Sequence, residues 1–157
     1  MEAMSLRSMS EEETIAIGQQ FATNLHVGDV VALYGELGAG KTEFVKGICA
    51  HFNVADIVTS PTFTIINQYA GQTPDGAPMR IYHVDLYRIE SDRELAEVGF
   101  DDCVFSHAAV KLVEWPDKAE HLMPPHYAVH ISADPDNDDA RQIDIAFIRE
   151  PHGAENI

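Results

Sequence analysis

The chain has 157 residues, 45% of them hydrophobic and 23% charged. This composition is typical of one globular domain and excludes both a large multidomain enzyme and a disordered or collagen-like chain. Lys and Arg number 10 against 26 Asp and Glu, so the net charge is −16, and most of such a surface repels nucleic acid. We therefore expect any role on nucleic acid to be exerted through a more basic partner.

The N-terminal segment leads into the first predicted helix. In a single domain covering the whole chain, residues 1–10 are predicted to be disordered and 151–157 to form a tail. No apolar stretch approaches the roughly 20 residues of a membrane span, and the N-terminus runs into glutamates, which favours a soluble, cytoplasmic protein. Ser10 and Glu13 have the spacing of a capping box, which predicts a helix over about 11–25.

A glycine-rich loop follows a short apolar run. "VVALY" (30–34) has the composition of a buried strand, and "KTEFVKGICAHF" (41–52) has apolar residues at helical spacing. Between them, "GELGAGKT" (35–42) matches the phosphate-binding pattern G-x-x-x-x-G-K-T. In this pattern the glycines let backbone N–H groups surround an anion, Lys41 reaches the terminal phosphates and the Thr42 hydroxyl ligates Mg²⁺. The sequence therefore predicts a nucleotide phosphate site with Mg²⁺.

Strands and a short helix are predicted after the loop. β-branched and aromatic residues favour strands over 62–69 and 80–87, joined by a loop rich in turn-forming residues. Ser91 and Glu94 form a second capping box, which starts a short helix that ends near Gly99. These features predict alternation of strands and helices.

The C-terminal third is predicted to hold three more strands, over 108–115, 127–132 and 142–148. The acidic segment 133–141 lacks the Gly and Glu that a calcium loop requires, so it is predicted to be an exposed turn. The two cysteines have no thiol or His at metal-ligand spacing, and we expect them to be buried small apolar residues.

Acidic residues end two of the predicted strands. Asp85 closes "RIYHVD" and Glu114 closes "AVKLVE", and a nucleotide site needs acids at strand ends for the Mg²⁺ shell and for the attacking group. We expect Asp85 to serve the metal and Glu114 to polarise water or complete the metal shell. The alternatives are a turn-forming aspartate at 85 and a surface glutamate at 114.

The pattern of other residues favours slow ATP hydrolysis. No N-K-x-D segment for guanine recognition occurs, so ATP is favoured over GTP. The six arginines are scattered along the chain and form no lid segment of the kind that clamps a transferred phosphoryl group in small-molecule kinases. Hydrolysis that awaits a partner fits this chain better than transfer to a metabolite.

Five stretches carry a resemblance to a known family. In chain order they are "GELGAGKT" (35–42), "SPTFT" (60–64), "HVDLYR" (83–88), "ELAEVG" (94–99) and "LVEWP" (112–116). In this order and at this length, the chain closely resembles the TsaE (YjeE) family over about residues 10–132. That family consists of bacterial ATPases required to make threonylcarbamoyladenosine in tRNA. Glu43 stands where a small hydroxyl residue is frequent in the family.

The resemblance implies a fold, an activity and partners. The expected fold is an α/β P-loop NTPase with a central, largely parallel (mixed) sheet flanked by helices. The expected activity is Mg²⁺-dependent ATP hydrolysis that is weak alone. The expected partners are the TsaD and TsaB proteins, which transfer the threonylcarbamoyl group to the adenosine beside the anticodon, so that tRNA is reached only through the complex.

Site residues follow position by position. The catalytic candidates are Lys41, Asp85 and Glu114, and the metal candidates are Thr42, Asp85 and Glu114. The expected nucleotide-binding residues are Glu36, Leu37, Gly38, Ala39, Gly40, Lys41, Thr42, Glu43, Thr62, Thr64 and Trp115. "SPTFT" is expected to act like a first switch segment around the γ-phosphate, with a turn that enters a strand as the alternative.

Several neighbouring residues keep two interpretations. His83 alternates with Asp85 along one strand, so it either orients Asp85 or the switch, or is a packed, hydrogen-bonded histidine. Trp115, the only tryptophan, either reports nucleotide at the rim of the site or fills the core. Tyr87 and Arg88 are either a partner-sensing segment or a surface pair. For the whole protein, the rival functions are a small-molecule kinase and a non-hydrolysing nucleotide-binding adaptor.

Overall fold

A computed structural model describes residues 3–36, 38–59, 61 and 65–149. The expected nucleotide contacts of Leu37, Thr62 and Thr64 therefore lie outside the described residues. In the described part of the chain the strands are β1 (Met4–Ser8), β2 (Val30–Tyr34), β3 (Ile66–Gln72), β4 (Pro78–Asp85), β5 (Ala109–Glu114), β6 (His126–Asp134) and β7 (Asn137–Ile148). The helices are α1 (Glu11–Ala22), α2 (Lys41–His51), α3 (Asp92–Glu97) and α4 (Phe100–Val104), with 3-10 turns η1 (Pro116–Lys118) and η2 (Glu120–Leu122).

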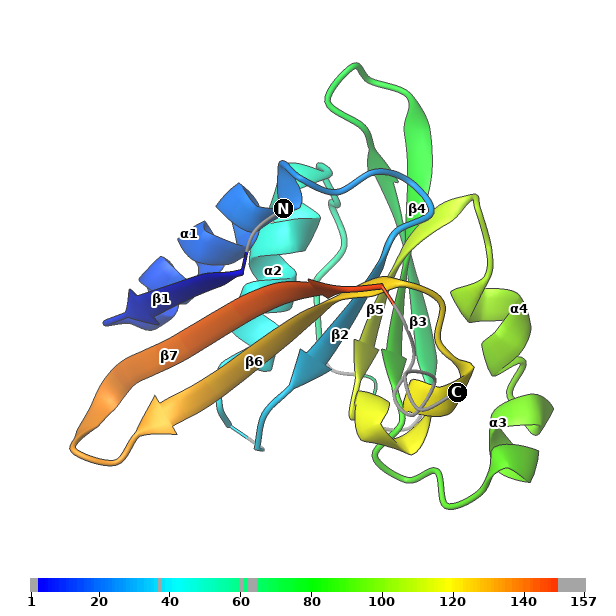
Figure 1. Cartoon of the computed structure of the whole chain (residues 1–157). Helices are drawn as coiled ribbons and strands as arrows, with labels where there is room; N and C mark the ends of the chain where they lie inside the picture. Colours follow the sequence, from blue (N-terminus) through cyan, green and yellow to red (C-terminus); the bar gives the residue numbers. More distant parts are fainter. Residues whose placement is uncertain (1–2, 37, 60, 62–64, 150–157) are drawn as a thin grey trace.

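All the strands belong to one mixed sheet with the order β1-β7-β6-β2-β5-β4-β3 (Figure 1). Pairing is parallel at the centre, where β2 lies between β6 and β5 and β5 also pairs with β4. The pairs at both edges are antiparallel. The predicted α/β fold with a mixed sheet is confirmed. Because parallel strands share one direction, β2, β5 and β4 all end at the same edge of the sheet.

Helices cover both faces of the sheet (Figure 1). Alternate residues of β2 point to opposite faces: Val31 and Leu33 join the core beneath α1 and α2, whereas Val30 and Ala32 join the core beneath α3 and α4. The two N-terminal helices pack closely through Gly47, where a Cβ would lie 2.0 Å from the Ile15 carbonyl oxygen. This close packing fixes the direction in which α2 leaves the loop that follows β2.

The first ten residues were expected to be disordered, and for most of them this is wrong. Met4–Ser8 forms β1, which pairs antiparallel with the far end of the chain in β7. The segment is short and largely exposed, so it carries no strong periodic signal, and the ladder with β7 decides its structure. The Ser8 hydroxyl also bonds the Thr14 hydroxyl at 2.7 Å, which attaches β1 to α1.

Other boundaries differ in detail from the predictions. α1 starts after the Ser10 cap as predicted, but it ends at Ala22, and α4 was not predicted. The final strand pair is confirmed, although β7 begins at Asn137, so that much of the acidic segment is strand. Both cysteines are buried and free, as expected. No helix in the described ranges is long and apolar enough to cross a membrane.

Candidate functional site

The glycine loop connects β2 to α2 at the edge where the parallel strands end. α2 begins at Lys41 after Gly40, whose φ of 113° is open to glycine at little cost. Gly40 has no side chain, so no side chain at the N-cap position accepts a hydrogen bond from the first-turn N–H groups of α2. A helix start of this kind presents backbone N–H groups and the positive end of the helix dipole to an anion.

Lys41 lies folded across the loop. Its Nζ donates a hydrogen bond of 2.7 Å to the carbonyl oxygen of Gly35 and lies 4.2 Å from the centre of the Trp115 ring. The residue is only 5% exposed. Burial lowers the pKa of Lys41, and the charge of Glu114 opposes that shift. The ammonium group is therefore held at the loop by a carbonyl, a carboxylate and an aromatic face.

Glu114 ends β5 and is buried, with 3% of its surface exposed. Its Oε1 lies 3.9 Å from Lys41 Nζ, and its Oε2 lies 2.6 Å from His83 Nε2. The alternative of a surface glutamate is therefore wrong. Of the two interpretations of His83, the contacts show the packed, hydrogen-bonded histidine: it is fully buried, and its hydrogen bond goes to Glu114 and not to Asp85.

Asp85 ends β4 directly beside Glu114 in the parallel register of β4 and β5. Burial raises the pKa of the Asp85 carboxyl, the nearby charge of Glu114 raises it further, and a hydrogen bond from the Tyr87 N–H opposes both. That bond, 2.9 Å to Asp85 Oδ1, also closes a turn after the strand. Asp85 thus forms the turn that the alternative interpretation predicted, and it also lies beside Glu114.

Trp115 adopts a left-handed backbone with φ of 56°, which is uncommon outside glycine. Its half-buried ring contacts Lys41 and packs against Tyr87 with ring centroids 4.9 Å apart. The same ring also packs against the core beneath α3 and α4. Trp115 therefore serves both as partial core packing and as one wall beside the lysine, and it connects that lysine to Tyr87, which is 50% exposed.

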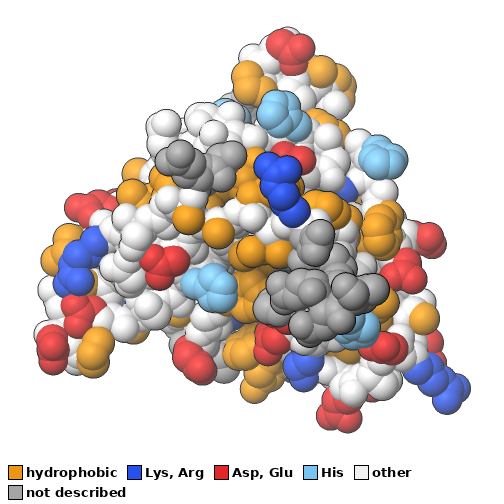
Figure 2. All heavy atoms as spheres, in the orientation of Figure 1, with side chains coloured by type: hydrophobic (Ala, Val, Ile, Leu, Met, Phe, Trp, Pro, Cys, Tyr) orange, Lys and Arg blue, Asp and Glu red, His pale blue; other side chains and the backbone are white. Residues whose placement is uncertain are grey.

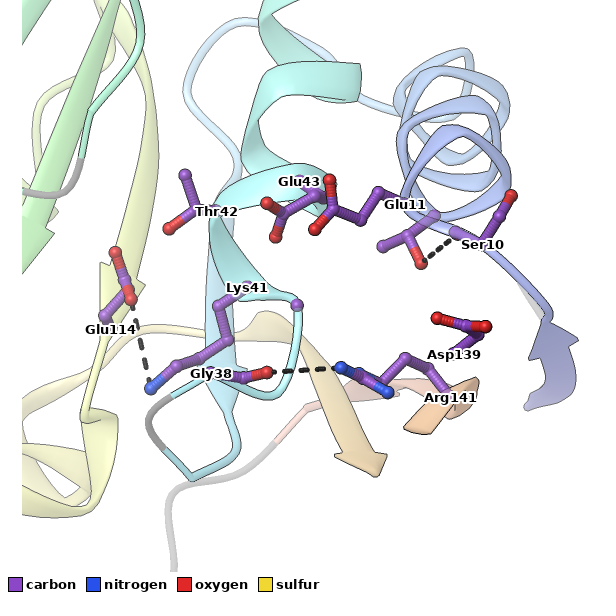
Figure 3. Close-up of a pocket in the computed structure, with 11 residues that line it drawn as sticks. Ser10, Glu11, Gly38, Lys41, Thr42, Glu43, Glu114, Asp139 and Arg141 are labelled. Atoms are coloured by element: carbon purple, nitrogen blue, oxygen red, sulfur yellow. Dashed lines mark hydrogen bonds and ion pairs between the residues drawn. The ribbon is translucent and has the colours of Figure 1, made fainter. Parts of the chain in front are cut away.

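A pocket of about 400 Å³ opens beside the loop. In Figure 3, Lys41 and Glu114 point toward one another at one end, and Arg141 points toward the Gly38 carbonyl from the other. Of the predicted residues, those that line the pocket are Gly38, Gly40, Lys41, Thr42, Glu43 and Glu114. Glu36, Ala39 and Trp115 instead line a second cavity of about 640 Å³ with Tyr34 and His130, and Asp85 lines neither of these two.

The remaining pocket residues were not predicted as site residues. They are Ser10, Glu11 and Thr14 at the start of α1, and Asp139 and Arg141 on β7. Ser10 was identified only as a helix cap, Asp139 only as part of an acidic turn and Arg141 only as one of six scattered arginines. The one signal available was the cap itself, since it fixes the start of α1, but nothing local indicates that this start faces the loop.

The residues at the sheet edge suit an ion such as Mg²⁺, which takes few ligands from the protein, better than a metal whose ligands all come from protein side chains. Within the described ranges no three His, Cys, Asp or Glu side chains gather as a metal site. Mg²⁺ needs no such cluster, because it usually takes one or two carboxylates and completes its shell with phosphate oxygens and water. Thr42 lines the pocket and Asp85 lies beside Glu114, and both carry oxygen atoms of the hard kind that Mg²⁺ binds.

Comparison with known proteins gives consistent results. A family model described as "Threonylcarbamoyl adenosine biosynthesis protein TsaE" matches residues 8–143. A protein of Bacillus subtilis named "tRNA threonylcarbamoyladenosine biosynthesis protein TsaE" is 41% identical over 124 residues, covering 79% of this chain and 73% of the relative. A protein of the same name from Treponema pallidum is 34% identical over 139 residues, covering 88% of this chain and 97% of the relative. The crystal structure of Bacillus subtilis YdiB superposes with a TM-score of 0.71 at 34% identity, covering 94% of this chain and 86% of that one.

Proposed function

Because the chain belongs to the TsaE family, we propose that it is a Mg²⁺-dependent ATPase in the synthesis of threonylcarbamoyladenosine in tRNA. The observation that carries this proposal is the placement of Lys41 and Glu114 in one pocket at the start of α2. The lysine supplies the charge for the phosphates, and the buried carboxylate supplies a base next to them. A role in tRNA modification agrees with the cytoplasmic location expected from the sequence.

The pocket suggests how a nucleotide lies. We assign the phosphates to the first turn of α2, where the backbone of residues 38–42 and Lys41 Nζ bind oxygens. The pocket continues from there to Ser10 and Arg141, and we assign the nucleoside to that part. Glu36, Ala39 and Glu43 remain proposed neighbours through their backbone, and the predicted roles of Leu37, Thr62 and Thr64 remain predictions.

Each acid has a separate task in the proposed reaction. Glu114 orients water and accepts its proton, since its Oε1 already faces Lys41, the group we assign to the γ-phosphate. Asp85 and Thr42 would hold the ion, and Mg²⁺ would neutralise negative charge on the phosphates. A bound cation also favours the ionised form of Asp85, whose pKa burial raises.

The two rival functions are less well supported by the pocket. A small-molecule kinase is expected to bring several arginines to the phosphate, but Arg141 is the only arginine among the described residues that line this pocket. A non-hydrolysing adaptor has no use for a buried glutamate held next to the lysine, because burying a carboxylate costs free energy.

The charge of the chain supports indirect work on tRNA. With a net charge of −16, acidic side chains are spread over the face seen in Figure 2, and Lys and Arg are sparse there. Such a surface favours contact with basic proteins over contact with a polyanion. The resemblance to the TsaE family suggests TsaD and TsaB as the partners, and the acidic surface supports the proposal that tRNA is bound by the complex and not by this chain alone.

The first test measures ATP hydrolysis by the chain alone and with purified TsaD and TsaB, with Mg²⁺ or with EDTA. We expect slow hydrolysis alone and a rate at least about tenfold higher with the partners, which corresponds to a barrier lowered by about 1.4 kcal/mol. EDTA should abolish both rates. Stimulation by a small metabolite, with transfer of phosphate to it, would instead favour the kinase.

Trp115 should report nucleotide binding directly. It is the only tryptophan, and its ring lies 4.2 Å from the Lys41 ammonium that we expect to move toward phosphate. Titration with ATP and Mg²⁺ should therefore produce a saturable change in tryptophan emission, and Lys41→Met should remove it. An unchanged emission in wild type, while calorimetry detects ATP binding, would show that Lys41 keeps its contact with the ring.

A further inference from the structure

His83 is a buried residue next to Glu114, to which it makes its one described polar contact. It is fully buried in β4, and its Nε2 lies 2.6 Å from Glu114 Oε2. The parallel register places His83 opposite Leu112 and Asp85 opposite Glu114, so the imidazole reaches diagonally to the end of the neighbouring strand. The ring therefore contacts Glu114 from the neighbouring strand.

The other ring nitrogen makes His83 a costly residue to bury. Among the described residues, His83 Nδ1 has no hydrogen-bond partner although it is buried. An unsatisfied buried nitrogen costs free energy that an apolar side chain of similar size would not. The contact with Glu114 is the one described hydrogen bond of this side chain that offsets the cost.

The two oxygens of Glu114 therefore have different surroundings. Oε2 is bound to His83, whereas Oε1 faces the pocket and stays 3.9 Å from Lys41 Nζ, too far for a hydrogen bond. A buried carboxylate without the histidine is expected to move onto the nearest cation, which is Lys41. A direct Lys41–Glu114 pair would occupy both the phosphate ligand and the base.

We propose that His83 is a positioning residue that holds Glu114 toward the attacking water and apart from Lys41. The inference rests on the proposed ATPase function and deepens it, because it names the group that sets the geometry of the base. His83 itself does not contact nucleotide in this scheme; it acts through Glu114.

The test compares steady-state ATP hydrolysis and ATP affinity in His83→Leu and His83→Gln. We expect His83→Leu to lower kcat by about 10- to 100-fold, because a shift of about 1 Å in a catalytic group has an effect of this size. ATP affinity should fall far less. His83→Gln should recover most of the rate, since its amide N–H can donate to the carboxylate from a similar position. If His83→Leu does not fold, His83→Asn replaces it, because the shorter amide does not reach Glu114.

A buried histidine elsewhere in the described chain provides the control. His126 lies at the start of β6, where its Nδ1 contacts the Pro124 carbonyl, outside the site. His126→Leu should keep kcat even if it lowers the thermal stability. In the Glu114→Gln background, His83→Leu should reduce kcat no further, because the residue through which it acts is already altered. A wild-type kcat in folded His83→Leu, or full additivity in the double variant, would overturn the proposal.

A crystal structure of the His83 variant separates this inference from the proposed function. In His83→Leu, or in His83→Asn, we expect the Glu114 carboxylate to contact Lys41 Nζ directly. A carboxylate in its original place would overturn the positioning role. If wild type does not hydrolyse ATP, even with TsaD and TsaB, the ATPase function is contradicted instead. The position of Glu114 in the variant crystal still tests the positioning role of His83.

Discussion

Lys41→Met is expected to weaken ATP binding by about 10- to 100-fold, because hydrogen bonds to charged groups contribute about 1.5–3 kcal/mol. Methionine keeps most of the apolar stem, which lies buried beside Trp115. The loss is therefore confined to the ammonium group, which donates to Gly35 in the free loop and which we assign to the phosphates in the complex. Isothermal titration with ATP and Mg²⁺ measures the affinity.

The same helix offers a matched control for Lys41. Lys46 lies further along α2 and is exposed, outside the pocket. Lys46→Met removes the same charge from the same helix, so it should leave the affinity for ATP close to that of wild type. Thermal unfolding of both variants checks that the fold is intact. Wild-type ATP affinity in a folded Lys41→Met variant would refute the phosphate-binding role of the loop.

The sequence predicts the loop and its flanks because their signals are local. A glycine with a left-handed backbone, a lysine at the first helical position and an apolar strand before them all lie within 30–52, and each one has a direct physical meaning. The position of the acids at 85 and 114 at this edge was predicted for a related reason. Parallel strands end at a common edge, so a strand-terminal acid can be assigned to that edge once the strands are identified.

The parts that were missed depend on contacts between distant segments. Ser10 and Arg141 face the loop because α1 packs on α2 and because β7 returns beside β6. β1 becomes a strand only through its pairing with β7. The partner of His83 is set by the register between β4 and β5, and a shift of one residue would turn the side chain to the other face.

Glu114→Gln should bind ATP with nearly wild-type affinity and lose about 100-fold or more in kcat, which is the usual contribution of a general base. Glutamine has nearly the same shape, and its carbonyl oxygen can still accept a hydrogen bond from His83, so the site should keep its geometry. The neutral amide cannot take a proton from water. It also removes a negative charge from beside Lys41, at 3.9 Å, so phosphate binding should not be weakened.

The experiment for Glu114 separates binding from turnover. Isothermal titration gives the affinity, and phosphate release in the presence of TsaD and TsaB gives the rate. Glu97→Gln is the control, because Glu97 lies exposed on α3 and pairs only with Arg93 among the described salt bridges. It should behave as wild type in both measurements. Lost binding with full turnover of the ATP that still binds would show that Glu114 belongs to the binding site alone and that another group orients the water.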